Sequence, residues 1–222
     1  MDDIRAGFKA RGPWVTGFKI DGQWSGGVYP AEDDFRLREF RKRFPRPQRV
    51  LDLGSLEGGH TFQIAKFAGH VTAIEGRLAN IEKSRWLQGA LGIDNVEFRQ
   101  EDLETSRLAS LGRFDVVFNV GLLYHLANPA DLLGQLAMLS DFMFLWTHVA
   151  RAATTNINGY DGEHYAEHGM ADPLSGLGAT SFWPTPIALD GMLSNSGFRS
   201  TEVIQRDDYA NYPSVLMLCT RG

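Results

Sequence analysis

The sequence has 222 residues, a length that fits one domain with an appended cap better than two separate domains. Hydrophobic residues make up 43% and charged residues 22%, which is ordinary globular usage and excludes wholesale disorder. A net charge of −5 disfavours a general nucleic-acid or anionic-membrane binder, and the single cysteine excludes an intrachain disulfide and a cysteine-based zinc site. Neither a secretory leader nor a long apolar stretch is visible, so we expect a cytoplasmic protein with no membrane partner.

The first 47 residues predict a hairpin and a helix. Asp21-Gly22 lies between aromatic-rich flanks in residues 14–29, which predicts a hairpin turn with positive φ at both central positions. Residues 31–44 place apolar side chains on one helical face, with Asp33 or Asp34 as the N-cap. The segment 36–49, taken as one helix, carries seven basic side chains and one acid. This pattern favours a solvated face, with a site for an anionic substrate or RNA as the alternative.

From residue 49 onward, strands and helices alternate. This rhythm predicts βαβ units and an α/β fold, a mostly parallel sheet with helices on both faces. A polar, aromatic and glycine-rich segment, 150–184, interrupts it and is too long for an idle loop, which indicates a substrate cap. The expected strands are 49–53, 70–75, 95–102, 114–120, 142–148, 200–205 and 214–220, and the expected helices are 61–68, 78–92, 129–139 and 186–198.

A glycine-rich turn follows the first of these core strands. Gly54, Gly58 and Gly59 permit a tight turn and a close backbone approach to a ligand. Leu56 stands where a dinucleotide-binding fold has its second glycine, and Glu57 adds negative charge where a pyrophosphate would lie. The turn therefore disfavours NAD or ATP and favours a ligand without phosphates, even a positively charged one.

Polar residues end the next three strands. Glu75 lies 21 residues beyond Gly54, where an acid can accept hydrogen bonds from both hydroxyls of a ribose. Asp102 ends the third strand, where it or its backbone can meet an adenine amino group, and the backbone after Asn119 can hold an α-amino group. The alternative is structural: Asp52 as a turn acid, Glu75 as an exposed strand end and Asp102 as a helix cap.

Four segments together resemble the class I S-adenosylmethionine-dependent methyltransferases: VLDLGSLEGGH, AIEGR, EDLE and FDVVFNVGLLYHLANP. The resemblance implies a Rossmann-like, seven-stranded sheet of order 3-2-1-4-5-7-6 with the last strand antiparallel. It also implies S-adenosyl-L-methionine as cofactor, bound around Asp52, Gly54, Glu75, Asp102 and Asn119. The neighbouring residues Ser55, Gly58, Arg77, Leu103, Val120 and Tyr124 complete the expected cofactor set.

The sequence also narrows the type of methyltransferase. We divide the chain into an N-terminal cap of residues 1–47 and a methyltransferase core of 48–222, which contains the substrate-cap insert 150–184. The Asn/Asp-Pro-Pro-Tyr/Phe motif of DNA-amino and glutamine methylation is missing after the fourth strand, where NVGL stands. The motif layout is also similar to tRNA wobble-uridine carboxymethyltransferases, but the acidic charge makes a nucleic-acid acceptor unlikely. We therefore expect O- or N-methylation of a small molecule. Carboxymethyl transfer, intramolecular cleavage of the cofactor and non-catalytic binding are the alternatives.

Histidines and aromatic residues supply the acceptor-site candidates. Histidine titrates near neutral pH and suits a general base, so His148 and His125 are candidate catalytic residues, together with Tyr160. Tyr29, His164 and Trp183 are expected to bind the acceptor. His164 and His168 share a face if they lie on a helix, which leaves a metal site open, although we expect none. The oligomeric state is not readable from the sequence.

Overall fold

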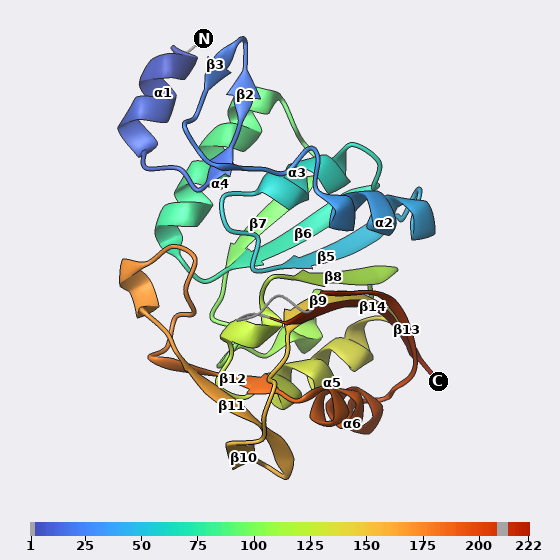
Figure 1. Cartoon of the computed structure of the whole chain (residues 1–222). Helices are drawn as coiled ribbons and strands as arrows, with labels where there is room; N and C mark the ends of the chain where they lie inside the picture. The colour runs from blue at the N-terminus through green and yellow to red at the C-terminus, as the bar shows by residue number, and fades with distance from the viewer. Residues whose placement is uncertain (1–2, 208–212) are drawn as a thin grey trace. The chain divides into compact units, whose positions relative to one another are not determined.

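The computed structural model describes residues 3–207 and 213–222 (Figure 1). The chain forms two compact units, Met1–Gln100 and Glu101–Gly222. Seven strands make one sheet in the order β13-β14-β9-β8-β5-β6-β7. The parallel pairs β5–β6, β6–β7 and β8–β9, with β14 antiparallel to β9, confirm the predicted α/β fold and the order 3-2-1-4-5-7-6. The division at residue 47 stays a prediction.

The first unit begins with short strands and helices that match the predicted hairpin and helix. Asp21 and Gly22 both have positive φ in the turn that joins β2 to β3, which confirms the hairpin. Asp34 caps the second helix by accepting from the Arg36 N–H, and Leu37 and Phe40 are buried beneath it. The elements are α1 (Ile4–Arg11), β1 (Thr16–Gly17), β2 (Lys19–Ile20), β3 (Gln23–Trp24), β4 (Tyr29–Pro30) and α2 (Phe35–Arg43).

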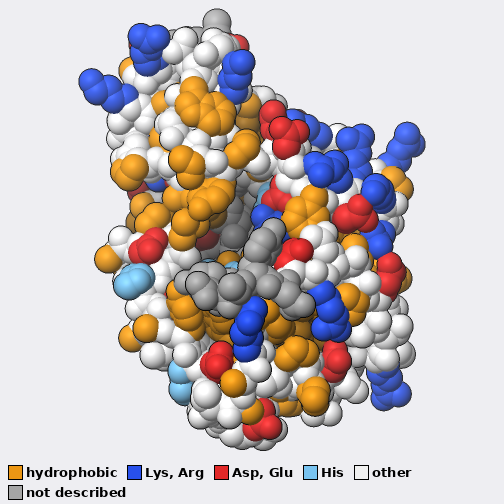
Figure 2. All heavy atoms as spheres, viewed as in Figure 1, with side chains coloured by type: hydrophobic (Ala, Val, Ile, Leu, Met, Phe, Trp, Pro, Cys, Tyr) orange, Lys and Arg blue, Asp and Glu red, His pale blue; other side chains and the backbone are white. Residues whose placement is uncertain are grey.

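The helix predicted over 36–49 is shorter than expected. α2 ends at Arg43, because Pro45 follows closely and cannot continue it, and Arg49 already opens the first core strand. Glu39 pairs with Lys42 and Arg43 on its exposed side. Figure 2 shows Lys and Arg side chains clustered at the surface in the region of α2, consistent with a solvated face.

The rest of the first unit alternates strands with helices as predicted. β5 and β6 are buried along nearly their whole length, whereas β7 alternates buried with more exposed residues, and α3 and α4 pack against β6 and β7. The elements are β5 (Arg49–Leu53), α3 (Gly59–Ala65), β6 (His70–Glu75), α4 (Leu78–Leu91) and β7 (Val96–Gln100).

The second unit continues the alternation and closes it with an antiparallel pair. Pro129 at the first turn of α5 and left-handed Gly197 after α6 mark the helix ends that the sequence indicated. Helices α5 and α6 lie side by side (Figure 1). Cys219, the single cysteine, is fully buried in β14. The elements are η1 (Leu108–Leu111), β8 (Val116–Val120), η2 (Leu123–His125), α5 (Pro129–Leu139), β9 (Phe142–His148), α6 (Pro186–Ser196), β13 (Phe198–Asp207) and β14 (Ser214–Arg221).

The insert 150–184 contains a small sheet that the sequence did not predict. Three antiparallel strands run in the order β10-β11-β12, and β11 also packs against α6. Glycine, asparagine and histidine dilute the apolar alternation there, so no period-2 pattern stands out. The elements are β10 (Thr155–Ile157), β11 (Tyr160–Ala166), η3 (Gly169–Ala171) and β12 (Thr180–Pro184). Among the described residues, no helix is both long and apolar enough to span a membrane.

Candidate active site

The glycine turn after β5 is held against the neighbouring strand by its backbone. Gly54 and Ser55 both donate their N–H groups to the carbonyl of Ile74, at 2.9 and 3.0 Å. Gly54 and Gly58 have positive φ, and so does Leu56, at φ 51°, a conformation that costs a residue with a Cβ roughly 1–2 kcal/mol. The turn is thus a fixed loop with one strained residue.

Glu75, at the end of β6, is a buried carboxylate that closes this turn. Its Oε2 accepts the Leu56 N–H at 2.9 Å and its Oε1 accepts the Arg77 N–H at 2.8 Å. Burial raises the pKa of Glu75, and the bonds from Arg77 and Leu56 oppose that rise. The Asn80 side-chain amide also lowers the pKa of Glu75, although Asn80 Nδ2 is not in hydrogen-bonding geometry with any described group. Each carboxylate oxygen has about two acceptor positions, so each of the two keeps one for a further donor.

Asp52, in β5, is also buried. Thr61 Oγ1 donates to its Oδ2 at 2.6 Å. Burial raises the pKa of Asp52 to about 6, assisted by the negative charge of Glu75 and opposed by Thr61 and His60. Two carboxylates with raised pKa beside one glycine turn form an acidic environment that a cation stabilises.

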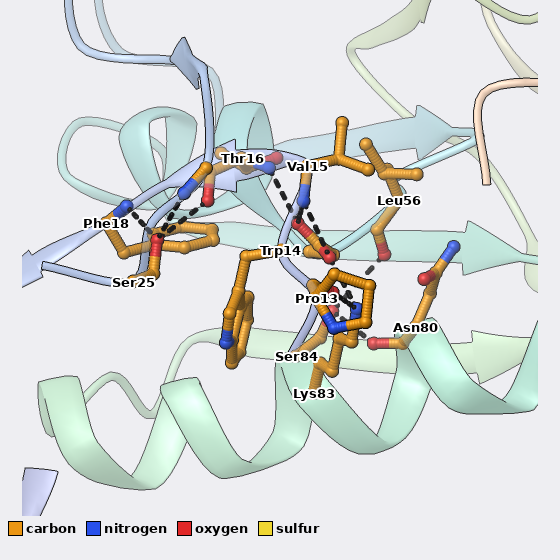
Figure 3. Close-up of polar contacts among 12 residues, drawn as sticks. Pro13, Trp14, Val15, Thr16, Phe18, Ser25, Leu56, Asn80, Lys83 and Ser84 are labelled. Carbon is orange, nitrogen blue, oxygen red and sulfur yellow. Dashed lines mark hydrogen bonds and ion pairs between the residues drawn. The ribbon is translucent and has the colours of Figure 1, made fainter. Parts of the chain in front are cut away.

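Glu57 does not place its charge at the turn surface as the sequence indicated. Its side chain is fully buried and its carboxylate accepts the N–H groups of Val15 and Thr16, with 2.7 Å to the Thr16 nitrogen. Lys83 Nζ lies 2.7 Å from Glu57 Oε1 and also donates to the Pro13 carbonyl. Figure 3 draws Val15, Thr16 and Lys83 with these contacts dashed. The charge is therefore compensated, and Glu57 anchors the N-terminal segment to the glycine turn.

Other predicted cofactor residues of the first unit lie on the same turn and the α4 entry. Ser55 Oγ and Asn80 Nδ2 are buried polar atoms with no hydrogen-bond partner in the described structure. Such atoms are rare in folded proteins and mark places where a ligand or water completes the bonding. Gly58 caps α3 in a left-handed conformation, and Arg77 is buried at the start of α4. These atoms fit a polar ligand such as a nucleoside.

In the second unit, the predicted cofactor residues lie after β7 and at the end of β8. Asp102 Oδ1 accepts the Glu104 N–H at 3.0 Å, so Asp102 caps a turn while Leu103 beside it is buried. Asn119 and Val120 are buried at the end of β8. Asn119 Oδ1 has no hydrogen-bond partner among the described residues. Like Ser55, it is a buried acceptor that a ligand can satisfy.

Aromatic rings cluster where β8 and β9 end. The His148 ring stacks on Trp183 with centroids 4.8 Å apart, and Trp183 stacks on Tyr165 at 4.7 Å. The Tyr124 ring contacts His148 edge-on at 4.4 Å and His125 at 4.2 Å. Trp183 Nε1 donates to the Tyr124 carbonyl at 2.9 Å, which ties β12 to η2. We call Tyr124, His125, His148, Tyr165 and Trp183 the aromatic cluster.

His125 forms a hydrogen bond with a buried carboxylate at the edge of this cluster. Its Nδ1 lies 2.9 Å from Oε1 of Glu167, whose side chain is only 1% exposed. Ser181 Oγ donates to the same oxygen, while Ser175 Oγ and the Gly176 N–H donate to Oε2. Burial alone would raise the pKa of Glu167, but the bonds from Ser175, Gly176, His125 and Ser181 outweigh it and lower that pKa.

The remaining predicted residues, Tyr160, His164 and Tyr29, are not members of the aromatic cluster. Tyr160 accepts a hydrogen bond from Asn195 of α6 at its hydroxyl, 2.9 Å away. His164 is exposed on β11, and Tyr29 is exposed on β4 of the first unit. Because β11 is a strand that ends before His168, the two histidines do not share a helical face, which overturns the geometry of the metal alternative. Within residues 3–207 and 213–222, no three potential ligands group around a metal position.

Two acidic residues of these sites were missed by sequence reasoning. Glu167 lies 42 residues from His125 in the chain, and no local spacing connects them. Glu57 was noticed only as a charge, because its partners lie about forty positions earlier along the chain. Fully buried acids need partners, so a glutamate expected in a buried segment is the one available signal.

A family model described as "Methyltransferase domain" matches residues 46–153. The search of curated proteins found no match. Among solved structures, the N-terminal domain of EvdMO1, crystallised in the presence of S-adenosylhomocysteine (SAH) and D-fucose, has a TM-score of 0.91 and 32% identity, covering 100% of this chain and 98% of that one. The chain spans about half of the longer EvdMO1 structure, 47%, at 30% identity and a TM-score of 0.79.

A more distant structure, the Burkholderia thailandensis 1,6-didemethyltoxoflavin-N1-methyltransferase with its substrate and SAH, shares the fold. It has 17% identity and a TM-score of 0.59, covering 84% of this chain and 76% of that one. The 32% identity over the full chain, together with the glycine turn, the acid after β6 and the sheet order, shows the family. The chain is a member of the class I S-adenosylmethionine-dependent methyltransferases.

Proposed function

We propose that the chain transfers a methyl group to a hydroxyl of a small, sugar-like molecule. The single observation that carries this proposal is the aromatic cluster, in which two histidines lie beside stacked rings at the ends of β8 and β9. Ligands of open α/β sheets bind beyond the carboxyl ends of the strands, so this is where an acceptor is expected.

For the cofactor, we propose that Glu75 accepts both ribose hydroxyls with the two positions its oxygens keep. We propose that the backbone of Gly54, Ser55 and Gly58 approaches the cofactor closely. Asp52 and Arg77 set the charge of this turn. When bound, S-adenosylmethionine supplies an electrophilic methyl group on a sulfonium. In the second unit we propose that Asp102, Leu103, Asn119, Val120 and Tyr124 are cofactor contacts.

For the acceptor, the stacked rings favour a compact ligand with an apolar face and polar edges. Trp183 is buried between His148 and Tyr165, so the rings form a rigid wall, and the outer ring, Tyr165, stays 37% exposed. Sugar rings have an apolar C–H face that stacks on aromatic rings, whose faces carry negative potential. The presence of D-fucose with the EvdMO1 N-terminal domain supports the same class. We also propose Tyr29, His164 and Tyr160 as residues that contact the acceptor.

For the chemistry, a hydroxyl is a weak nucleophile at neutral pH and gains from a base that takes its proton during the transfer. His148 and His125 are the two candidates for this role in the aromatic cluster. Removing a general base typically slows turnover about 100- to 10,000-fold. The apolar rings also exclude water from the reacting atoms.

The test is incubation of the purified chain with S-adenosylmethionine and separate acceptors: D-fucose, other monosaccharides, phenols and amines. Mass spectrometry should show SAH and a singly methylated monosaccharide, and the no-acceptor control should show neither. Methylthioadenosine without any acceptor would indicate intramolecular cleavage instead. Methylation of amines alone would overturn the hydroxyl assignment while leaving the family membership intact.

A further inference from the structure

We propose that His125 takes the proton of the acceptor hydroxyl and that Glu167 is the residue that positions it for this step. The inference rests on the proposed function and adds a positioning residue to it. It depends on the hydrogen bonds around one carboxylate, all of them within the second unit.

The carboxylate of Glu167 is saturated with donors. Oε1 receives His125 and Ser181, and Oε2 receives Ser175 and the Gly176 N–H, so its roughly four acceptor positions are all used. A buried carboxylate with this many donors stays ionised at neutral pH, in agreement with its lowered pKa. The group is thus a fixed negative charge beside the imidazole.

That charge fixes the tautomer of His125. An ionised carboxylate can only accept, so the proton between the two groups belongs to Nδ1 of the neutral imidazole. Nε2 then carries the lone pair, and no described residue hydrogen-bonds to it. The His125 side chain is 18% exposed, which leaves Nε2 reachable by a ligand.

The loop around Glu167 packs closely against the His125 backbone. A Cβ added to Gly176 would lie 2.6 Å from the His125 carbonyl oxygen and 3.2 Å from the Glu167 side chain. Only glycine permits this approach, so the loop lies directly against the His125 backbone and carries the carboxylate beside the imidazole. A base held in one rotamer and one tautomer is the arrangement that general-base catalysis needs.

The second candidate, His148, contacts a backbone carbonyl. His148 Nδ1 lies 3.3 Å from the carbonyl oxygen of Pro213, a neutral and longer contact. Once the base has taken a proton, a buried carboxylate stabilises the resulting imidazolium more strongly than a carbonyl does. His148 is also packed against Trp183, Trp146 and Tyr124, as expected for a residue of the binding wall.

The hydroxyl oxygen of the acceptor forms a bond to the methyl carbon while the bond between that carbon and sulfur breaks, and its electron pair stays on sulfur. The hydroxyl proton moves to Nε2 of His125, giving an imidazolium that faces the Glu167 carboxylate. The products are a methyl ether, SAH and protonated His125, which returns its proton to water.

The first measurement is the tautomer, read by NMR of ¹⁵N-labelled histidine at a pH where His125 is neutral, with its signal assigned from a His125→Gln variant. Wild type should show the proton on Nδ1. Glu167→Ala should move it predominantly to Nε2, because its partner is gone. Ser175→Ala is the matched control, since Ser175 bonds to the other oxygen, and should keep the proton on Nδ1. A wild-type His125 with its proton on Nε2 would overturn the proposal.

The second measurement is turnover, followed as SAH released with D-fucose as the probe acceptor. His125→Gln should lower kcat about 100-fold with KM changed less than threefold. Glu167→Gln keeps an acceptor for Nδ1–H but removes the charge, so it should keep the tautomer and lower kcat about tenfold. If Glu167→Ala does not fold, this loss of turnover in Glu167→Gln tests the positioning role in its place. A wild-type kcat in folded Glu167→Gln would refute the positioning role. If wild type methylates no hydroxyl, the proposed function fails, and the tautomer still decides the role of Glu167.

Discussion

Glu75 and Glu167 are both buried glutamates, yet their pKa values shift in opposite directions. Glu75 receives two backbone N–H groups, one on each oxygen, and its pKa is raised by burial. Glu167 receives four donors, two on each oxygen, and its pKa is lowered despite burial. More donors oppose the effect of burial at Glu167 than at Glu75, in keeping with the opposite directions of the two pKa shifts.

The difference indicates two kinds of work. A carboxylate with unused acceptor positions gains from a ligand that fills them, whereas a saturated one gains nothing and instead orients its donors. Glu57 gives a third case: it is fully buried and saturated by Val15, Thr16 and Lys83. By this criterion Glu75 belongs to ligand binding, Glu167 to orientation and Glu57 to stability.

The largest effect is expected for the ligand-binding member. Glu75→Ala removes two charge-assisted hydrogen bonds of about 1.5–3 kcal/mol each, so the affinity for SAH should fall at least tenfold. Isothermal titration calorimetry measures it, with circular dichroism to confirm folding. Glu167→Gln and the exposed Glu97→Ala should both bind SAH within twofold of wild type. Equal losses in the Glu75 and Glu167 variants would contradict the different roles of the two glutamates.

The next largest effect concerns stability. Glu57→Gln leaves Lys83, which is only 14% exposed, without its ion-pair partner, and we expect a loss of about 2–4 kcal/mol in the free energy of unfolding. Urea unfolding followed by circular dichroism measures the loss. The control is Glu39→Gln, whose pairs with Lys42 and Arg43 lie at the surface and should contribute less than about 1 kcal/mol. Similar losses in both variants would contradict the anchoring role of Glu57.

The pH dependence of stability is expected to have opposite signs for Asp52 of the first unit and Glu167 of the second. Because the pKa of Asp52 rises from 3.8 to about 6 on folding, the native state binds the proton more tightly. Its contribution to stability is greatest at low pH and is lost as pH rises from about 4 to about 6, an amount of about 3 kcal/mol. Denaturation at several pH values should show a flatter profile for Asp52→Asn. Glu167 has the opposite sign, since its lowered pKa means that its contribution is lost as pH falls. An unchanged profile in Asp52→Asn would refute the assignment.

The smallest effect is expected at Leu56. Glycine relieves the positive φ, but it also makes the unfolded chain more flexible, so Leu56→Gly should change stability by less than about 1 kcal/mol. The matched control is Asp21→Gly, at φ 47° in the hairpin outside the glycine turn. Calorimetric titration of both variants with SAH then tests whether the Leu56 side chain contacts the ligand. A loss of affinity in the Leu56 variant alone would place that side chain against the ligand, and equal affinities would leave it a structural residue.

Much of the fold could be predicted because its signals are local. The strands 49–53 and 70–75, the turn glycines and the helix ends depend on patterns only a few residues long. The small sheet of the insert was missed because glycine, asparagine and histidine dilute the apolar alternation of its segment, and the His125–Glu167 pair because it depends on tertiary packing. Glu57 illustrates the limit best: its identity is visible, but the direction of its side chain is fixed by backbone groups from another segment.

Cys219 has a practical consequence. Its thiol is fully buried in β14, and burial raises its pKa far above that of a free cysteine, so at neutral pH it stays protonated and unreactive. The sequence has no other cysteine. A cysteine introduced at an exposed position of either unit is therefore the only thiol that a maleimide dye can reach, and the wild-type background needs no prior cysteine removal. Pairs of such labels, one in each unit, make energy-transfer measurements of ligand-dependent movement possible in the otherwise native chain.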